Sequence, residues 1–178
     1  AVLGYDNPRL SQALIEAGLA LDEPRYTKAG LDSLAWIAQQ QLAASGHFRP
    51  VGSDTFGHPH ASLPFDQQPL EAQAAIEAAA AASRADRDSK KPAPELAAWR
   101  WFFGANDRGV VLADLASGRC RDGINPRGLN ENCGAESILA FQLAHYSLIG
   151  LLRGQQGDSC GERFVGEPQR IAEPAAHT

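Results

Sequence analysis

Apolar residues recur at helical spacing in five stretches of the chain, and these stretches predict five helices. In the first stretch, apolar side chains follow an i, i+4, i+7, i+11 pattern typical of an amphipathic helix: Leu10, Leu14, Ala17 and Leu21. Prolines near the starts and glycines after the ends support several boundaries, because each residue suits that position of a helix. The predicted helices cover residues 8–21, 25–44, 68–83, 95–103 and 135–152.

The segments between and after these helices read as irregular. Residues 47–64 are interrupted by proline and glycine and predict a loop. Residues 105–133 are rich in Gly, Asn and Asp, with one short β-like piece at 110–112, and a segment of this length inside a domain is usually functional or disordered. Few large apolar residues follow the last helix. We expect one helical domain over residues 1–153 and a flexible tail over residues 154–178.

An internal repeat relates the first two predicted helices to the next two. Residues 13–20 match residues 74–81, and residues 34–36 match residues 97–99, each of the latter pair ending in Trp. One unit is an αα-hairpin with a long return, repeated after about 60 residues. Because one hairpin cannot bury its apolar face alone, such units stack on neighbours. The pattern predicts an all-α fold of antiparallel αα-hairpin repeats.

Composition narrows the classes of partner. The 178 residues carry a net charge of -5 and are 44% hydrophobic, which is ordinary for a globular domain. Only three lysines are present (Lys28, Lys90, Lys91), whereas a nucleic-acid or anionic-membrane partner calls for a basic face. No apolar run approaches the roughly 20 residues that span a bilayer, and no signal segment opens the chain. The absence of methionine suggests a piece of a longer product.

The three cysteines indicate the compartment. Cys120, Cys133 and Cys160 form neither an even set nor a C-x-x-C motif, which favours free thiols in a reducing environment. We therefore expect a cytoplasmic protein. A Cys120–Cys133 bridge across a loop is the alternative.

Four motifs carry a resemblance to a known family. They are Asp-Gln-Gln-Pro-Leu-Glu at residues 66–71, Trp-Phe-Phe-Gly-Ala-Asn-Asp at 101–107, Gly-Arg-Cys-Arg-Asp-Gly at 118–123 and Asn-Glu-Asn-Cys-Gly-Ala-Glu-Ser at 130–137. Together with the hairpin repeats, these motifs resemble six-hairpin, (α/α)6-toroid glycosidase-like proteins. In particular, they resemble the toroid domain found carboxy-terminal to glycosyltransferases in some bacterial proteins.

The resemblance implies a fold, a ligand and a site. It implies that the chain is the carboxy-terminal part of a ring of twelve helices, and that its partners are a glycan or small sugar and a glycosyltransferase domain in the same polypeptide. It also implies that sugar-binding carboxylates lie where the inner helices begin. Carried over by motif, the candidate catalytic residues are Asp66, Glu71, Asp122 and Glu136.

The residues themselves fit such chemistry, but each also has a structural explanation. Glycoside hydrolysis needs one carboxylic acid to protonate the leaving oxygen and a second carboxylate as nucleophile or base. Glu136 or Asp66 would be the acid, and Glu71 or Asp122 its partner. Alternatively, Asp66 is a helix cap, Glu71 and Glu136 complement positive helix ends, and Asp122 is a turn residue.

Amide and aromatic side chains near these acids are the candidate substrate-binding residues. Amides hydrogen-bond sugar hydroxyls, and aromatic rings cover the apolar face of a sugar. The candidates are Gln67, Gln68, Asn130, Asn132, Phe65 and Trp101, with Phe56 as a further exposed ring. Trp36 and Trp99 lie at equivalent repeat positions and are expected in the core.

The sequence offers little support for metal, cofactor or nucleophilic chemistry. His58, His60 and Asp54 are three potential ligands, but no fourth has diagnostic spacing, so no metal site is expected. No phosphate-binding glycine loop and no G-x-S-x-G motif occurs, so no cofactor is expected. His145 is expected to be a packing residue whose ring nitrogens are satisfied by hydrogen bonds. Three classes of function stay open: a glycosidase-like enzyme, a non-catalytic domain attached to a glycosyltransferase, and a helical interaction module.

Overall fold

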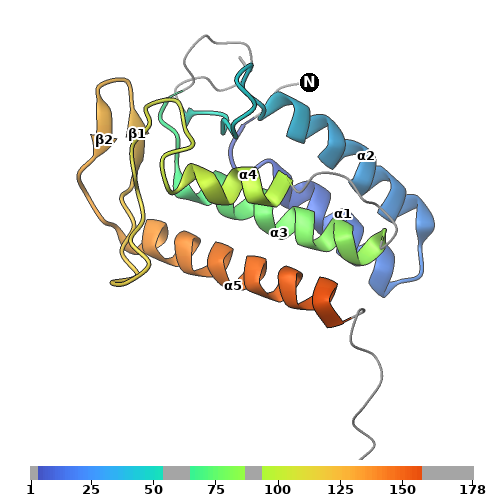
Figure 1. Ribbon diagram of the computed structural model, residues 1–178. Coiled ribbons are helices and arrows are strands. Elements are labelled where there is room, and N and C mark those ends of the chain that lie inside the picture. The colour runs from blue at the N-terminus through green and yellow to red at the C-terminus, as the bar shows by residue number, and fades with distance from the viewer. Residues whose placement is uncertain (1–3, 54–64, 87–93, 158–178) are drawn as a thin grey trace, which may run out of the picture.

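The structure, a computed structural model, describes residues 4–53, 65–86 and 94–157. These residues form a mainly helical fold with one small antiparallel sheet, which confirms the predicted helical class (Figure 1). The elements are α1 (Pro8–Ala20), α2 (Pro24–Gln40), α3 (Pro69–Ala85), α4 (Pro94–Trp101), β1 (Gly123–Asn125), β2 (Gly128–Asn130) and α5 (Ala135–Gly157).

Helix starts follow the prolines, whereas the helix ends differ from the prediction, most of all those of α2 and α5. Proline occupies the first turns of α1, α2 and α3, where its missing N–H removes no helical hydrogen bond. The second helix ends at Gln40 rather than residue 44, because Leu42 pairs with Phe48 across a tight turn. Gly46 makes that turn with a φ of 84°. The last helix continues to Gly157, five residues beyond the prediction.

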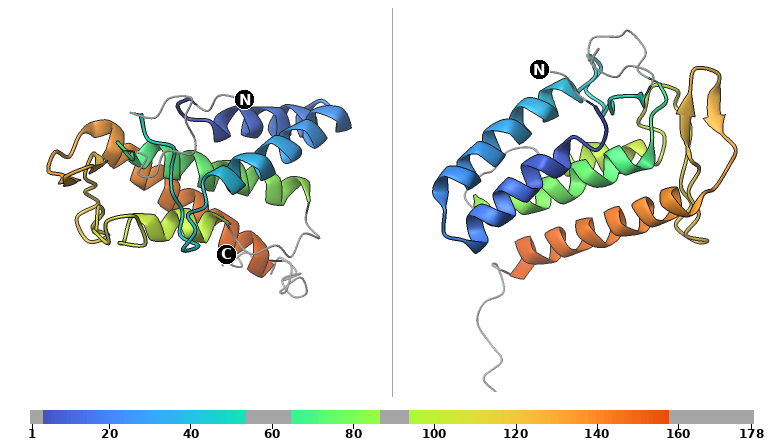
Figure 2. Two further views of the ribbon diagram at one scale, coloured as in Figure 1. Left: turned by 90° about the horizontal axis from the view of Figure 1, so that it is seen from above. Right: turned by 180° about the vertical axis from the view of Figure 1, so that it is seen from behind.

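Helix α3 is the centre of the fold, and its alanines explain why. It packs against α1, α4 and α5, and α1, α3 and α5 lie side by side with α3 in the middle (Figure 2). Ala72, Ala74, Ala78 and Ala81 of α3 are all fully buried. Small side chains let neighbouring helices approach α3 from several directions while alanine keeps the helix favourable.

The core lies between α3, α4, α5 and the loop after α4. Its largest buried side chains are Trp101, Phe65, Phe102, Phe141, Ile76 and Ile124. Trp99 stacks on Phe141 at 5.6 Å and on His145 at 5.2 Å between ring centroids, so the packing roles expected for Trp99 and His145 are confirmed. The expected hydrogen bonding of His145 is wrong for its buried Nδ1, which has no partner among the described residues. Trp36 differs: it is 39% exposed on α2, so its expected place in the core is wrong for the described residues.

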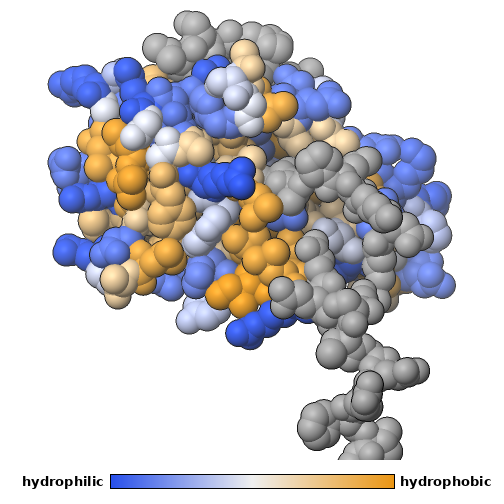
Figure 3. Space-filling model, viewed as in Figure 1, coloured by the Kyte–Doolittle hydropathy of each residue, from blue (hydrophilic) through white to orange (hydrophobic). Residues whose placement is uncertain are grey.

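The first predicted apolar stripe does not face the core. On α1, the buried residues are Pro8, Ser11, Ile15 and Gly18, whereas Leu10 is 77% exposed and Leu21 is 68% exposed. The buried face of α1 uses small residues because α2 lies very close: a Cβ on Gly30 would come within 2.8 Å of the Ser11 carbonyl oxygen. Apolar patches interrupted by polar side chains are visible on the face shown in Figure 3.

Helix α5 also leaves apolar side chains exposed. Leu139, Leu143 and Tyr146 are exposed, and Figure 1 shows α5 at the edge of the bundle. Among the described helices, Ala135–Arg153 is long and apolar enough by length and composition to cross a membrane, with a mean hydropathy of 1.3. The core helix of a soluble protein can pass the same test, so this finding is weak evidence for a span.

The segment before α5 is more regular than the sequence suggests. The predicted β-like piece forms an isolated bridge, Phe103 with Val111, and the two strands lie further along the chain. Strands β1 and β2 form a hairpin in which Gly123 faces Asn130 and Asn125 faces Gly128. This hairpin covers the amino-terminal ends of α3 and α5, where the site lies.

Candidate functional site

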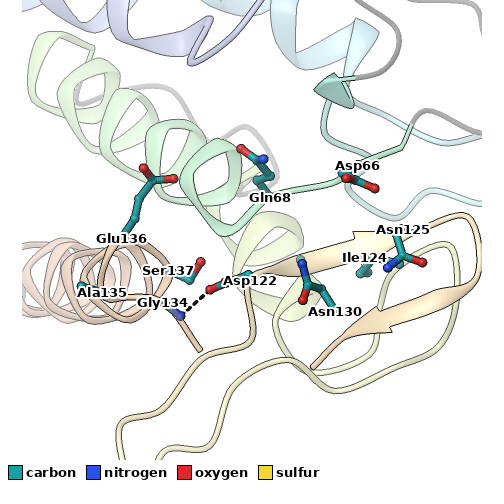
Figure 4. Close-up of a pocket in the computed structure, with 11 residues that line it drawn as sticks. Asp66, Gln68, Asp122, Ile124, Asn125, Asn130, Gly134, Ala135, Glu136 and Ser137 are labelled. Atoms are coloured by element: carbon teal, nitrogen blue, oxygen red, sulfur yellow. Dashed lines mark hydrogen bonds between the residues drawn. The ribbon is translucent and has the colours of Figure 1, made fainter. Parts of the chain in front are cut away.

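A pocket of about 340 Å³ lies where α3 and α5 begin, against the β1–β2 hairpin (Figure 4). Most of its lining side chains are polar, and three are carboxylates. The polar lining residues are Asp66, Gln68, Asp122, Asn125, Asn130, Glu136 and Ser137. The arrangement offers hydrogen-bond donors and acceptors around one cavity.

Five of the ten predicted site residues meet in this pocket although they come from different parts of the chain. Asp66 and Gln68 precede α3, Asp122 precedes β1, Asn130 ends β2 and Glu136 lies in the first turn of α5. In Figure 4, Glu136 and Asp66 lie on opposite sides of the pocket, with Gln68 between them. The shared location of acids at two helix starts agrees with the expectation from the sequence.

One of these acids also holds the pocket together. Asp122 Oδ1 accepts a hydrogen bond of 2.5 Å from the backbone N–H of Gly134, directly before α5 (Figure 4). A Cβ on Gly134 would lie 3.0 Å from the same oxygen, so glycine allows this close approach. The backbone N–H of Asp122 donates to the Asn132 carbonyl at 3.0 Å. Asp122 therefore fixes the start of α5, and with it Glu136.

The hairpin wall is joined to the segment directly before α3 by backbone hydrogen bonds. Gln67 and Ile124 exchange two N–H···O bonds of 2.9 Å each. Gly123 makes this contact possible, because its φ of 148° is rare for other residues and an added Cβ would lie 2.3 Å from the Gln67 carbonyl oxygen. The pocket wall is thus set by the main chain of the segment that carries Asp66 and Gln68.

Three predicted substrate-binding residues lie in the interior instead of the pocket. Trp101 donates from its indole N–H to Gln67 Oε1 at 3.1 Å, and Gln67 donates to Asp107 Oδ2 at 2.5 Å. Phe65 is buried beneath the Arg108 guanidinium, 4.9 Å above its ring. The structure does not bring Gln67, Trp101 or Phe65 to the pocket, because all three side chains are buried in the interior.

Glu71 is also not among the residues that line the pocket. Its Oε1 accepts a hydrogen bond of 2.6 Å from the Asp6 backbone N–H, and its Oε2 accepts one of 3.4 Å from the Gln41 amide. Burial raises the pKa of Glu71 to about 7, the hydrogen bond from Asp6 lowers it, and the negative charge of Asp6 raises it further. Glu71 anchors the segment before α1 to α3, so the placement does not fit the catalytic role expected for it.

The remaining predicted residues are outside the pocket or outside the described chain. Asn132 is exposed and is not among the lining residues. Phe56, His58, His60 and Asp54 lie outside the described residues. Within the residues that the structure covers, no group of three or more His, Cys, Asp or Glu is arranged to hold a metal ion.

Cys120 and Cys133 are both free thiols in the structure. Burial raises the pKa of Cys120 to about 12, and the nearby Cys133 and Asp122 add to this rise. A thiol with so high a pKa is a poor nucleophile. The third cysteine, Cys160, lies outside the described residues.

Several residues of the site and its support were missed from the sequence. Asp107 reads as a turn residue, yet its carboxylate is buried and accepts hydrogen bonds from Arg49 and His47 as well as Gln67. Tyr5 donates its hydroxyl to Glu136 Oε1 at 3.3 Å across 131 positions of the chain. Residues 5–8 (Tyr-Asp-Asn-Pro) and 65–69 (Phe-Asp-Gln-Gln-Pro) share an aromatic residue, an aspartate and a helix-opening proline, and this match was the available signal for Tyr5.

Comparison with known proteins adds no identification. No protein-family model matches this sequence, and no curated protein matches it significantly. The functional interpretation therefore depends on the pocket and on the residues that line it.

Proposed function

We propose that this chain is a glycosidase-like domain that holds a glycan in the pocket at the start of α3 and α5. The observation that carries the proposal is the convergence of Asp66, Asp122 and Glu136, with the amides of Gln68 and Asn130, on one cavity. Ligand pockets commonly have volumes of roughly 300 Å³ or more, and this pocket reaches that size.

The lining favours an uncharged or cationic sugar. Carboxylates accept hydrogen bonds from hydroxyl groups, and amides both donate and accept them, which matches the alternating groups of a polyol. Among the described residues, three carboxylates and no lysine or arginine line the pocket. A phosphorylated sugar would meet negative charge there, so the proposed ligand carries no phosphate.

Within the proposal, the acids have different roles. Glu136 and Asp66 are the pair that would act on a glycosidic bond, one as acid and one as nucleophile or base. Asp122 positions α5 through Gly134. Glu71, engaged by Asp6 and Gln41 in the interior, has no part in the pocket chemistry.

A non-catalytic glycan- or partner-binding domain, attached to a glycosyltransferase, is the second candidate. The use of two predicted catalytic acids in structural contacts favours it: Glu71 holds the segment before α1, and Asp122 holds the start of α5. The same pocket would then bind a glycan without cleaving it.

The proposal also includes the architecture of the complete fold. Helices α1, α3 and α5 lie side by side, with α3 in the middle. The two outer helices expose apolar residues: Leu10 and Leu14 on α1, and Leu139 and Leu143 on α5. Stacked hairpins leave such faces uncovered where further hairpins follow. This supports the proposal that the chain is part of a larger (α/α) toroid.

A glycan array tests the proposal. The wild-type chain should bind a defined set of oligosaccharides, and Glu136→Gln and Asp66→Asn should each weaken that binding at least about ten-fold, the cost of a hydrogen bond to a charged group. Glu131→Gln, an exposed acid outside the pocket, is the matched control and should bind like the wild type.

The outcomes separate the candidates. Shortened products from the bound oligosaccharide, detected by mass spectrometry, support the glycosidase-like function. Binding without products supports the non-catalytic domain. Equal binding by wild type, Glu136→Gln and Asp66→Asn, or no binding at all, contradicts both and favours a helical interaction module.

A further inference from the structure

An aromatic residue that was not predicted for the site, Tyr5, lies beside the pocket. Phe65 and Trp101 are buried in the core, so neither ring can cover a sugar. Tyr5 is 48% exposed, and its hydroxyl contacts Glu136, which lines the pocket. Tyr5 is therefore an aromatic side chain that is hydrogen-bonded to an acid of the pocket.

Tyr5 is held in place by the elements that build the pocket. The next residue, Asp6, has a φ of 53° and donates its backbone N–H to Glu71 in the first turn of α3 at 2.6 Å. Asn7 closes the same turn by accepting a hydrogen bond of 2.8 Å from the Gly4 backbone N–H. The segment that contains Tyr5 is thus fixed to the first turn of α3, directly after the pocket residue Gln68.

The hydroxyl of Tyr5 stays a donor over the working pH range. Partial burial, and then the negative charge of Glu136 and its hydrogen bond, raise the pKa of Tyr5 above its ordinary value of 10.0. The hydroxyl contacts only one carboxylate oxygen of Glu136, Oε1. This contact orients the carboxylate.

We propose that Tyr5 completes the glycan site: its hydroxyl positions Glu136, and its ring covers the apolar face of a sugar at the pocket rim. The inference rests on the proposed glycan function and adds a binding residue to it. An aromatic ring beside a carboxylate suits a sugar, because a sugar presents both an apolar face and hydroxyl groups.

Two variants separate the roles of the ring and the hydroxyl. Tyr5→Phe keeps the ring and removes the donor, whereas Tyr5→Leu removes both with a similar apolar bulk. Tyr146→Phe, on the exposed face of α5, is the matched control. The probes are malto-, cello- and chito-trisaccharides, with binding followed by ligand-detected NMR.

We expect the wild type and Tyr146→Phe to bind at least one trisaccharide equally. Tyr5→Phe should weaken that binding about three-fold and Tyr5→Leu about ten-fold, in line with one hydrogen bond and one aromatic contact. Binding by both Tyr5 variants at the wild-type affinity overturns the role of Tyr5 and leaves the glycan function standing.

A second measurement does not depend on any sugar. Ultraviolet titration of the phenol groups should show a high-pKa tyrosine that disappears in Tyr5→Phe and titrates lower in Glu136→Gln. An unchanged titration in Glu136→Gln overturns the Tyr5–Glu136 contact. If the contact is present but the wild type binds none of the trisaccharides, the glycan function is rejected and this role for Tyr5 with it.

Discussion

At the scale of single residues, the most informative side chain is an acid that is not in the pocket. Glu71, in the first turn of α3, is 2% exposed, and its carboxylate accepts a hydrogen bond from the Asp6 backbone N–H. This contact is structural. From the sequence, a first-turn acid beside Asp66 is equally compatible with capping and with catalysis. Only the path of the segment before α1 decides between them, and that path is a tertiary feature.

The raised pKa of Glu71 predicts a pH-dependent stability. With a pKa of about 7 in the folded chain and 4.5 as the ordinary value, the folded chain binds more protons between these values. Stability should therefore fall as pH rises from about 4.5 to 7 and then level off, with a total loss of about 3 kcal/mol. Glu71→Gln should remove this fall, because the amide cannot ionise and can still accept from the Asp6 N–H.

Urea unfolding at pH 5 and pH 8 measures this effect. Glu71→Gln should gain stability over the wild type mainly at pH 8. Glu131→Gln, at an exposed position, should stay within about 0.5 kcal/mol of the wild type at both pH values. A wild-type chain equally stable at both pH values would contradict the prediction.

The second residue with a clear consequence is Asp107. Its burial acts to raise its pKa, but hydrogen bonds from Arg49, Gln67 and His47 outweigh burial, so the pKa is lowered from its ordinary value of 3.8. The stabilisation is present above that ordinary value and is lost as pH falls through the lower, folded pKa. Asp107→Asn should cost about 2 kcal/mol at neutral pH, because Arg49 loses its charged partner.

Denaturant titration of Asp107→Asn at pH 7 and pH 3 checks this expectation, with a smaller difference from the wild type expected at pH 3. Asp114→Asn is a suitable control, since Asp114 makes only local contacts in an exposed turn. Equal costs for the two variants would show that the contacts of Asp107 add no stability beyond a local turn.

At the scale of elements, helix starts were predictable and the buried faces were not. Proline in a first turn is a local property, so the starts of α1 and α3 follow from the sequence. Which face of α1 is buried depends on α2, whose Gly30 accepts close contact with Ser11 and Ile15 and leaves the leucines outside. The hairpin was missed because its strands have three residues each, too few for a two-residue period to stand out.

The pairing between the hairpin and the segment before α3 gives a prediction with a matched pair of glycines. Gly123 and Gly128 both have positive φ, at 148° and 138°, but only at Gly123 would a Cβ meet backbone, 2.3 Å from the Gln67 carbonyl oxygen. Gly123→Ala should lose at least about 2 kcal/mol more than Gly128→Ala, because it must break the Gln67–Ile124 pairing as well as strain the main chain.

Thermal unfolding of the two variants, with amide hydrogen exchange at Ile124, checks this difference. Exchange at Ile124 should be faster in Gly123→Ala than in Gly128→Ala. Equal losses in the two variants would mean that the backbone conformation, and not the contact with Gln67, sets the cost.

At the scale of the whole molecule, the sequence predicted the end of the fold where the pocket lies, but only half of the residues it proposed for the site line that pocket. The motif at residues 130–137 and the acids before α3 pointed to helix starts, and Asp66, Asp122 and Glu136 do share one pocket. The sequence pattern predicts that a residue lies near the start of a helix, but it does not predict whether the side chain of that residue is buried or exposed. That is why Gln67, buried against Trp101, could not be distinguished from its neighbour Gln68.

The exposed apolar residues give a prediction for the chain by itself. Leu10→Gln on the outer face of α1 should change stability by less than about 0.5 kcal/mol, whereas Ile15→Ala on the buried face should cost about 3 kcal/mol. Chemical denaturation of both variants measures the contrast. A large loss for Leu10→Gln would mean that its face is covered in solution.

The common direction of α1, α3 and α5 has an electrostatic consequence. The Asp6–Glu71 bond joins the starts of α1 and α3, and the pocket joins the starts of α3 and α5. Three sets of aligned peptide dipoles therefore present their positive poles at one end of the molecule. Substitution of side chains leaves these main-chain dipoles in place, so a variant with Asp66, Asp122 and Glu136 all changed to their amides should leave a cavity that attracts anions and disfavours cations.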